Sequence, residues 1–494
     1  MSAAGAPRFT VTALDLYERD VRLRLPFRFG DATLRDAPQA FVRARIVDPQ
    51  GREALGWTAE LMVPKWFDKS PGRNPAENID DLRRALALAR DAYMADRAAR
   101  TAFGHAASHY HALLADGAAN GLNPLIVSFG AALADRAILD ALCRLRQVSF
   151  ADAVRANLPA IDPALSPDLR DFDFDAFLAS LAGGDRIAAR HTVGLVDALV
   201  AADIVERPVD DLPVALDEVI ARYGHHHFKL KLSGAATHDV PRLVRIATVL
   251  DRLPSYAVTL DGNEQFDDVA AFAAEWRQMV ATPALARLTA AVLYVEQPLA
   301  RERSFDADVA FIARDVPLII DEADDTFDAF PRALRCGYAG VSSKNCKGPY
   351  KSLVNTARCA AASSSTRAFI SGEDLTAQCG LAVQQDLALA ALIGVGHVER
   401  NGHHYADGFA GQHAPLAEQA AFFAAHGDLY DTGAHGVRLA IRDGAISLRS
   451  LGGVGFAAAA HPDAAALVPL RLEAPTRKLQ AADMSIRPHR PAHS

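Results

Sequence analysis

Two lysines alternate with apolar residues in the segment "HFKLKL", where Lys229 and Lys231 stand two positions apart. Residues i and i+2 of a strand lie on the same face, so both ammonium groups would project from one side of an apolar strand. Burying two such charges side by side is costly. A second positive charge nearby lowers the pKa of a lysine, and a lysine that is neutral near pH 7 can remove a proton. We therefore interpret this pair of lysines as part of an acid/base catalytic site.

Charged residues also end the strand-like runs that follow, at intervals of about one βα unit, roughly 30 residues. They are Asp261 in "TLDGN", Glu296 in "YVEQP", Asp321 with Glu322 in "IIDEAD", and Lys344 with Lys347 in "SSKNCKG". The C-terminal ends of parallel barrel strands meet at one rim, so we expect these side chains to converge. Three convergent carboxylates repel unless a cation lies between them. Oxygen ligands suit Mg²⁺, and we expect Mn²⁺ to substitute for it.

The elements that must position these residues begin near residue 187, where short apolar runs alternate with amphipathic helices. Eight such runs, from "ARHTVGLV" to "GVGHVERN", indicate repeated βα units, and eight is the strand number of a TIM barrel. Before them, alternating segments such as "FTVTALDLYERDVRLRL" predict antiparallel strands, followed by helices. We predict an α+β capping domain over 1–160, a linker or insertion over 161–186, a barrel over 187–425, a C-terminal segment returning to the capping domain over 426–474 and a disordered tail over 475–494.

Composition excludes several classes of function. The net charge of −8 and the pI near 6.1 argue against a nucleic-acid or anionic-membrane partner. We find no apolar run of the roughly 20 residues that a membrane span needs, and no secretory signal. The five cysteines are odd in number and scattered, which is typical of reduced thiols. We therefore expect a cytoplasmic protein.

The order K-x-K, D-x-N, E-Q-P, D-E, K-x-x-K-G resembles the enolase superfamily, in particular its muconate-lactonizing-enzyme subgroup within the mandelate racemase/muconate lactonizing enzyme group. "LPFRFGDA" and "GWTAELMVPKWF" resemble the two loops that close the substrate pocket, and "DRAILDALCRL" resembles the helix that enters the barrel. The resemblance implies a modified TIM barrel of (β/α)7β type with an α+β capping domain. It also implies Mg²⁺-dependent abstraction of a proton α to a carboxylate.

Residue roles follow from the same resemblance. It implies Asp261, Glu296 and Asp321 as metal ligands, with Glu322 as the alternative on the fifth strand. It implies Lys231 and Lys344 as opposing acid/base lysines and Lys229 as the electrostatic partner of Lys231. The residues implied in substrate binding or in support of the site are Asn263, Glu322, Lys347, Glu373, Asp374, Phe29 and Trp66. We expect a small-molecule carboxylic acid as substrate and a homo-oligomer.

The net reaction stays open between a racemase or epimerase and a cycloisomerase. Alternatives are a syn elimination, as in a dehydratase or an o-succinylbenzoate-synthase-like lyase, and a binding module without turnover. The predicted seventh strand, "AFISGEDL", has no histidine, which disfavours the mandelate-racemase subgroup. The predicted eighth, "GHVERNGHHYADG", lacks the D-x-D of dipeptide epimerases.

Two histidine groups resemble metal motifs. Consecutive strand residues alternate faces, so His225–His227 cannot converge on one ion, and we predict a solvated loop there. His105, His109 and His111 have a spacing compatible with zinc, but the sequence offers no fourth ligand. We therefore predict no zinc at either group.

Overall fold

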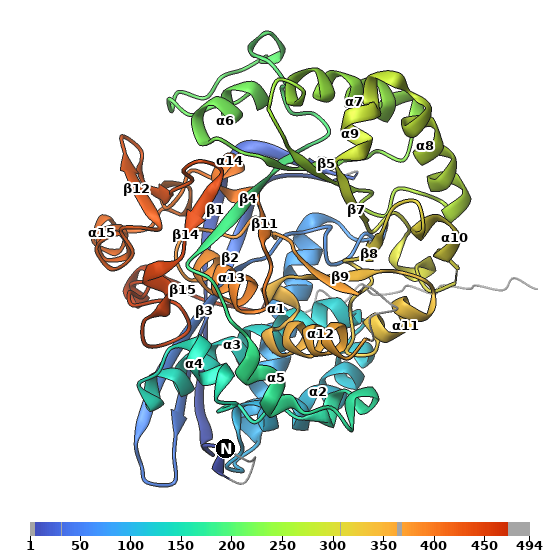
Figure 1. Ribbon diagram of the computed structural model, residues 1–494. Coiled ribbons are helices and arrows are strands. Elements are labelled where there is room, and N and C mark those ends of the chain that lie inside the picture. Colours follow the sequence, from blue (N-terminus) through green and yellow to red (C-terminus); the bar gives the residue numbers. More distant parts are fainter. Residues whose placement is uncertain (1–4, 31, 307, 363–367, 473–494) are drawn as a thin grey trace, which may run out of the picture.

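The computed structural model describes residues 5–30, 32–306, 308–362 and 368–472. A closed parallel barrel packs against a region made of an antiparallel sheet and helices (Figure 1). The predicted disordered tail, 475–494, lies outside the described residues. No helix in the described ranges is long and apolar enough to cross a membrane.

The capping sheet has the strand order β15-β1-β2-β3 and is antiparallel. Its strands are β1 (Thr10–Phe29), β2 (Ala32–Val47), β3 (Glu53–Leu61) and β15 (Val468–Pro469). Buried and solvent-facing residues alternate along β1, as expected for a sheet with one face on a core. The pairing of β1 with β2 shifts register between Arg22 and Phe27, and then resumes up to Phe29. This last part of the hairpin reaches the barrel.

Five helices accompany this sheet; the first and third of them pack on it, and the other three pack on these two or on one another. They are α1 (Pro75–Ala95), α2 (Ala102–Ala119), α3 (Pro124–Arg146), α4 (Phe150–Arg155) and α5 (Phe174–Ser180). Helix α1 begins with a capping box, in which Asn74 and Glu77 accept each other's backbone N–H groups at 2.9 Å. Helix α3 packs closely against both β3 and α1. A Cβ atom at Gly56 would lie 2.1 Å from the Ala137 carbonyl oxygen, and one at Gly130 would lie 2.2 Å from the Ala85 carbonyl oxygen. Only glycine fits at these two contacts.

The barrel strands are all parallel, and the pairing of β11 with β4 closes the ring. They are β4 (Arg186–Val193), β5 (His227–Lys231), β6 (Ala257–Asp261), β7 (Val292–Glu296), β8 (Leu318–Ile320), β9 (Gly340–Ser343), β10 (Phe369–Gly372) and β11 (His397–Arg400). These are the eight predicted runs, so the predicted barrel is confirmed.

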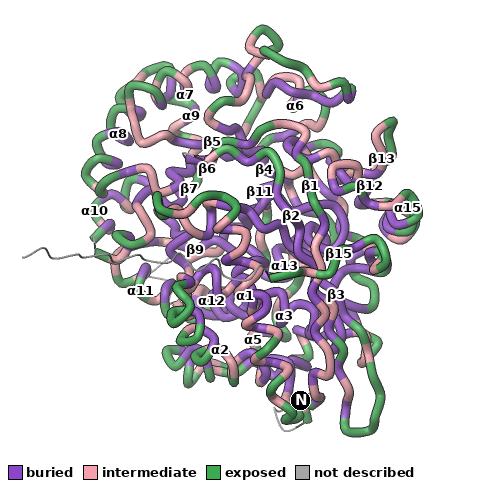
Figure 2. Tube along the Cα trace, turned by 180° about the vertical axis from the view of Figure 1, so that it is seen from behind, coloured by how far each residue is buried: buried purple, intermediate pink, exposed green. Residues whose placement is uncertain are grey.

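Helices surround the barrel strands (Figure 1). They are α6 (Leu216–Tyr223), α7 (Ala236–Leu250), α8 (Val269–Ala281), α9 (Ala286–Ala290), α10 (Ala310–Ala313), α11 (Ala329–Arg335), α12 (Pro349–Ala361) and α13 (Leu381–Leu392). The short helix α14 (Gly402–Tyr405) and then α15 (Leu416–Ala425) follow the last strand. Figure 2 shows that the strands are buried while α7 and α8 expose one side to solvent.

The C-terminal segment connects the barrel to the capping sheet. It forms the hairpin β12 (Tyr430–Gly433) and β13 (Gly436–Leu439), and then β14 (Ala445–Ser447), which pairs antiparallel with β4. Strand β15 then pairs with β1 at Tyr17 and Glu18. Segment 161–186, which we predicted as a linker or insertion, contains α5 and buries Leu165, Leu169 and Leu178 in the same core as the capping region.

Candidate active site at the barrel rim

The register of the barrel strands brings the predicted site residues to one rim. Lys231 pairs with Asp261, and Asp261 pairs with Glu296. Asp321 and Lys344 directly follow the ends of β8 and β9. Because side chains alternate along each strand, these residues point into the barrel at similar depth. The carboxylates and lysines therefore converge at one rim of the barrel, as we predicted from the sequence.

Lys229 lies at the centre of a cluster of four carboxylates. Its Nζ is 2.9 Å from Asp261, 2.6 Å from Glu296, 2.8 Å from Glu373 and 3.0 Å from Glu399. All five side chains are buried. Burial alone would lower the pKa of Lys229, but the four carboxylates outweigh it and raise the pKa well above the ordinary lysine value. Lys229 is therefore the shared counter-ion of this cluster.

The two proposed acid/base lysines approach one cavity from different strands. Lys231 Nζ donates to Asp261 Oδ2 at 2.6 Å, and Lys344 Nζ donates to Asp321 Oδ2 at 2.6 Å. Lys231 lies 5.9 Å from the centre of the Phe27 ring, and Lys344 lies 4.3 Å from a Trp66 ring. Both lysines, together with Phe27, Phe29 and Trp66, line a small cavity of about 20 Å³. Residues of the capping region thus cover the lysines.

The carboxylates around Lys229 and Lys344 raise the pKa values of both lysines. The lowered pKa that we predicted for a lysine beside further positive charge, a bound cation included, stays a prediction. For Lys344, burial acts to lower the pKa, and the attraction of Asp321 and then Glu296 overcomes it. The carboxylates outweigh the effect of one ammonium group on the other.

Asp261, Glu296 and Asp321 offer the donor set of a hard divalent cation. Each is 1% exposed, and they stand at the ends of three successive strands. Glu296 Oε1 has no hydrogen-bond partner among the described residues. Burial, followed by the nearby charges of Asp261 and Glu373, raises the pKa of Glu296 well above its usual value. A buried carboxylate with an unpartnered oxygen beside two others fits Mg²⁺, which prefers oxygen ligands.

The alternative ligand, Glu322, contacts the capping region instead. Its Oε1 lies 3.3 Å from Lys69 Nζ, which is also 2.6 Å from Glu264 Oε2 and donates to the carbonyl oxygen of Asn263 at 2.8 Å. Lys69 therefore joins the capping region to the loops after the third and fifth barrel strands. This arrangement favours Asp321 over Glu322 as the inward-facing ligand.

Arg301 forms a second connection between the two regions. Its guanidinium donates to the carbonyl oxygens of Trp66 and Phe67 at 2.8 Å and pairs with Glu264 at 2.8 Å. The backbone at Trp66 is thereby held over the cavity. Sequence reasoning missed Lys69 and Arg301, because neither lies in a recognisable motif.

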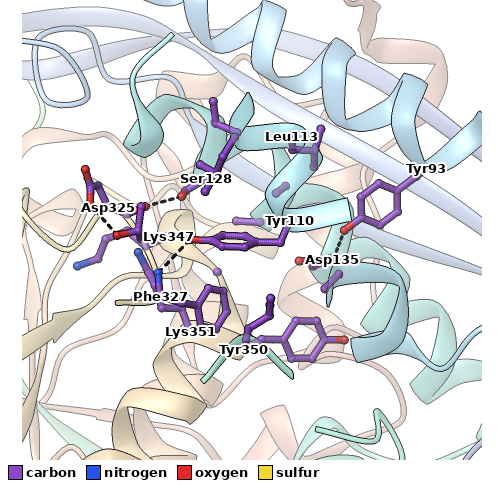
Figure 3. Close-up of a pocket in the computed structure, with 18 residues that line it drawn as sticks. Tyr93, Tyr110, Leu113, Ser128, Asp135, Asp325, Phe327, Lys347, Tyr350 and Lys351 are labelled. Atoms are coloured by element: carbon purple, nitrogen blue, oxygen red, sulfur yellow. Dashed lines mark hydrogen bonds between the residues drawn. The ribbon is translucent and has the colours of Figure 1, made fainter. Parts of the chain in front are cut away.

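Lys347 contacts Asp321 from the side away from the cavity of Lys231 and Lys344. Its Nζ donates to the carbonyl oxygen of Ser342 at 2.9 Å and lies 3.0 Å from Asp324 and 3.4 Å from Asp321. A separate cavity of about 40 Å³ lies on this side, between the barrel and α2 and α3. Figure 3 shows this cavity with Tyr110, Phe327 and Lys351 around it. It is distinct from the cavity of Lys231 and Lys344.

The last barrel strands complete the charge cluster. Glu373 pairs with Arg190 and accepts from the Tyr294 hydroxyl at 2.9 Å, and its pKa is lowered by Arg190 and Lys229 against the effect of burial. Asp374 accepts from Arg400 at 2.8 Å and from the Ala377 backbone at 2.8 Å, so it braces the loop after β10. It also lines the cavity.

Sequence reasoning missed Glu399 and Arg190. Glu399, on β11, also lines the cavity and binds Lys229. The signal was present, since "GHVERN" places Glu399 near the end of the eighth run and "ARHTV" places Arg190 in the first. Each single charged residue was too weak a pattern to select by itself.

No family model matches the sequence, and no curated protein matches it. Solved structures are similar over nearly the whole chain. A 2-chloromuconate cycloisomerase from Rhodococcus opacus 1CP is 17% identical with a TM-score of 0.56, covering 92% of this chain and 97% of that chain. A dipeptide epimerase from Cytophaga hutchinsonii, complexed with Mg and the dipeptide D-Ala-L-Val, is 14% identical with a TM-score of 0.57, covering 93% and 98%.

An enolase from Bradyrhizobium, complexed with magnesium and mandelic acid, is 15% identical with a TM-score of 0.57, covering 92% of this chain and 96% of that chain. Cycloisomerases and epimerases thus share this arrangement of a barrel and a capping region. The similarity extends over both parts of the chain. The chain therefore has the fold of the enolase superfamily, and the resemblance seen in its motifs is confirmed at the level of the fold.

Proposed function

We propose that this protein is a Mg²⁺-dependent enzyme that abstracts the proton α to a carboxylate and forms an enolate. The observation that carries the proposal is the pair Lys231 and Lys344, which line one buried cavity from the second and sixth barrel strands. Carboxylates Asp261 and Asp321 contact these lysines, and Glu296 lies between them along the rim.

The three carboxylates would hold the cation. When bound, Mg²⁺ supplies positive charge to the substrate carboxylate oxygens, which makes the enolate accessible. The solved structures from Bradyrhizobium and Cytophaga hutchinsonii contain magnesium, which supports the same ion here. Lys229, held by Glu373 and Glu399 on its other side, would keep the carboxylate cluster electrostatically balanced.

Each acid/base lysine serves one face of the substrate. Lys231 and Lys344 come from strands across the barrel, so each would remove or return a proton at the α carbon from its own side. Phe27 and Trp66 lie over the two ammonium groups and would exclude water from the reacting atoms. The cavity of about 20 Å³ is smaller than a carboxylic acid substrate, so the capping segments would have to move to admit one.

Two lysines on opposite faces favour racemisation, epimerisation or cycloisomerisation of a small carboxylic acid. The same pair also permits a syn elimination, with one lysine acting as base and the other only through its charge. A binding module without turnover is disfavoured, because it has no need of two buried lysines beside a metal site.

The test is a screen of acid sugars, N-acyl amino acids and lactone precursors in D₂O with Mg²⁺, scored by NMR for deuterium uptake at the α carbon. We expect uptake on at least one acid, abolished by a chelator and restored by Mg²⁺. Protein with Asp261→Asn is the matched negative control. Binding of an acid without any exchange would establish the binding module instead, and exchange that persists in the chelator would refute the metal role.

A further inference from the structure

A second group of potential metal ligands lies outside the barrel, away from the carboxylate cluster. His191 is on β4, His225 lies two residues before β5, and His403 and His404 are on α14. We predicted a solvated loop for His225–His227, and this is wrong for His225, which is 0% exposed. Its ring centre lies 5.3 Å from that of His191 and 5.2 Å from that of His403. The His225 ring therefore packs against these two rings and is not in contact with solvent.

The hydrogen bonding of His225 leaves one nitrogen available. Its Nδ1 lies 3.0 Å from the carbonyl oxygen of Ala189. A carbonyl oxygen only accepts, so Nδ1 carries the proton and Nε2 presents a bare lone pair. Nε2 of His225 and Nδ1 of His191 have no hydrogen-bond partner in the described part of the chain. A carbonyl that fixes one nitrogen while the other stays free is the usual support of a metal-binding imidazole.

The nitrogens are close enough to share one ion. Candidate ligand atoms of His191, His225 and His403 all lie within 4.8 Å of one another. Zinc binds imidazole nitrogen at about 2.0–2.1 Å, so small side-chain rotations would bring the three onto one centre. A fourth imidazole, that of His404, lies with its ring centre 5.0 Å from His191, and its Nδ1 also has no partner among the described residues.

We propose that His191, His225 and His403 bind a Zn²⁺ ion, with His404 as the nearest candidate for a fourth ligand. Imidazole nitrogens suit zinc and not Mg²⁺, which requires oxygen.

The role of this ion would be structural. Helix α14 follows β11 and Asn401, and Asn401 lines the cavity between the two proposed bases. Bound zinc would tie α14 to the outer side of β4 and to the chain before β5. The loop that carries Asn401 would then be fixed from outside the barrel.

Another histidine group competes for this role and fits it less well. Ligand atoms of Asp96, His105 and His109 also lie within 4.8 Å of one another. The Asp96 carboxylate, however, already pairs with Arg100 at 2.7 Å, and the positive charge of the Arg100 guanidinium would repel a metal ion there. His111, the third histidine of the motif in the sequence, is exposed and does not join the group.

The experiment uses the whole chain without a histidine tag, stripped by a chelator and kept in excess Mg²⁺ so that the carboxylate site does not take zinc. Zn²⁺ is then titrated against a chromophoric chelator. The variant is His225→Gln, and the matched control is His226→Gln, which changes the adjacent exposed histidine. We expect wild type and His226→Gln to bind one more Zn²⁺ than His225→Gln, or to bind it at least roughly 100-fold more tightly.

Equal stoichiometry and affinity in wild type and His225→Gln would overturn the proposal, as would loss of the zinc in His109→Gln instead. If His225→Gln does not fold, His403→Gln replaces it, because His403 is only partly buried. The visible spectrum of bound Co²⁺ gives a second measurement in the folded wild type. A spectrum that is unchanged by His403→Gln would also overturn the site.

Discussion

Replacement of Lys229 by methionine would leave buried carboxylates without their shared ammonium group while keeping a side chain of similar length. In the native structure its Nζ lies between 2.6 and 3.0 Å from Asp261, Glu296, Glu373 and Glu399. At an effective dielectric constant near 20, each contact corresponds to about 6 kcal/mol of gross Coulomb attraction. Desolvation of the charges cancels most of this sum.

Removing one partner from a buried ion pair costs about 3–5 kcal/mol, because the remaining charge is left uncompensated. We therefore expect Lys229→Met to lower the free energy of unfolding in chelator by about this amount. Mg²⁺ would neutralise part of the same cluster. At 100 times its dissociation constant it should restore about 2.7 kcal/mol.

The assay is urea unfolding followed by circular dichroism, with and without Mg²⁺. The double variant Lys229→Met, Glu399→Gln is the matched control, since it removes one cation and one carboxylate together and should recover part of the loss. A free energy of unfolding within about 1 kcal/mol of wild type in chelator would refute the counter-ion role of Lys229. A free energy of unfolding that is the same with and without Mg²⁺ in Lys229→Met would refute the metal site beside it.

Three further predictions follow from the site and the fold. Glu296→Gln should weaken Mg²⁺ binding by at least roughly 100-fold and abolish α-deuterium exchange, while the circular dichroism spectrum stays unchanged. Full exchange in this variant would contradict the assignment of Glu296 as a metal ligand. In a racemase or epimerase, Lys231→Ala and Lys344→Ala should each abolish turnover but keep exchange with one stereoisomer. In an elimination or cycloisomerisation, loss of the base ends all exchange and loss of the other lysine slows it about 10²–10³-fold; exchange in the double variant would exclude both. Burial raises the pKa of Asp135, which accepts from the Tyr93 hydroxyl, to about 7. Because the folded protein then holds this proton more tightly than the unfolded chain, stability should fall as pH rises from about 4 to 7, by at most about 4 kcal/mol. Asp135→Asn should remove this fall in pH-dependent unfolding, exposed Asp116→Asn should keep it, and an unchanged profile in Asp135→Asn would contradict the raised pKa.

Local sequence patterns were sufficient to predict the barrel strands and the charged residues at their C-terminal ends. Apolar runs at the spacing of βα units predicted the strands, and strand alternation placed Lys231 and Asp261 on the inner side. The raised pKa values of Lys229 and Lys344 were not predicted, because they depend on how many carboxylates surround each ammonium group. Glu399 lies on the last barrel strand, β11, and reaches Lys229 on β5 because β11 pairs with β4 and closes the ring.

Contacts between the capping region and the barrel were also beyond sequence reasoning. Lys69 meets Glu264 and Glu322 across long stretches of chain, and Arg301 meets the backbone at Trp66. Such pairs depend on the relative placement of two folded parts, and neither partner has a local pattern that names the other. The burial of His225 has the same origin, since its neighbours come from β4 and α14.

The return of the C-terminal segment has a consequence for the order of synthesis. Strand β1 leaves the ribosome before the other described strands, yet its edge partner β15 is among the last described residues to be made. Phe456, which stacks on Phe150 with ring centres 3.8 Å apart, arrives equally late. Until then Tyr17 and Glu18 of β1 lack their partner strand, and an unpaired strand edge is a template for wrong pairing. The capping region and the barrel therefore cannot be completed one after the other, because the capping sheet gains β15 only after all barrel strands have been made.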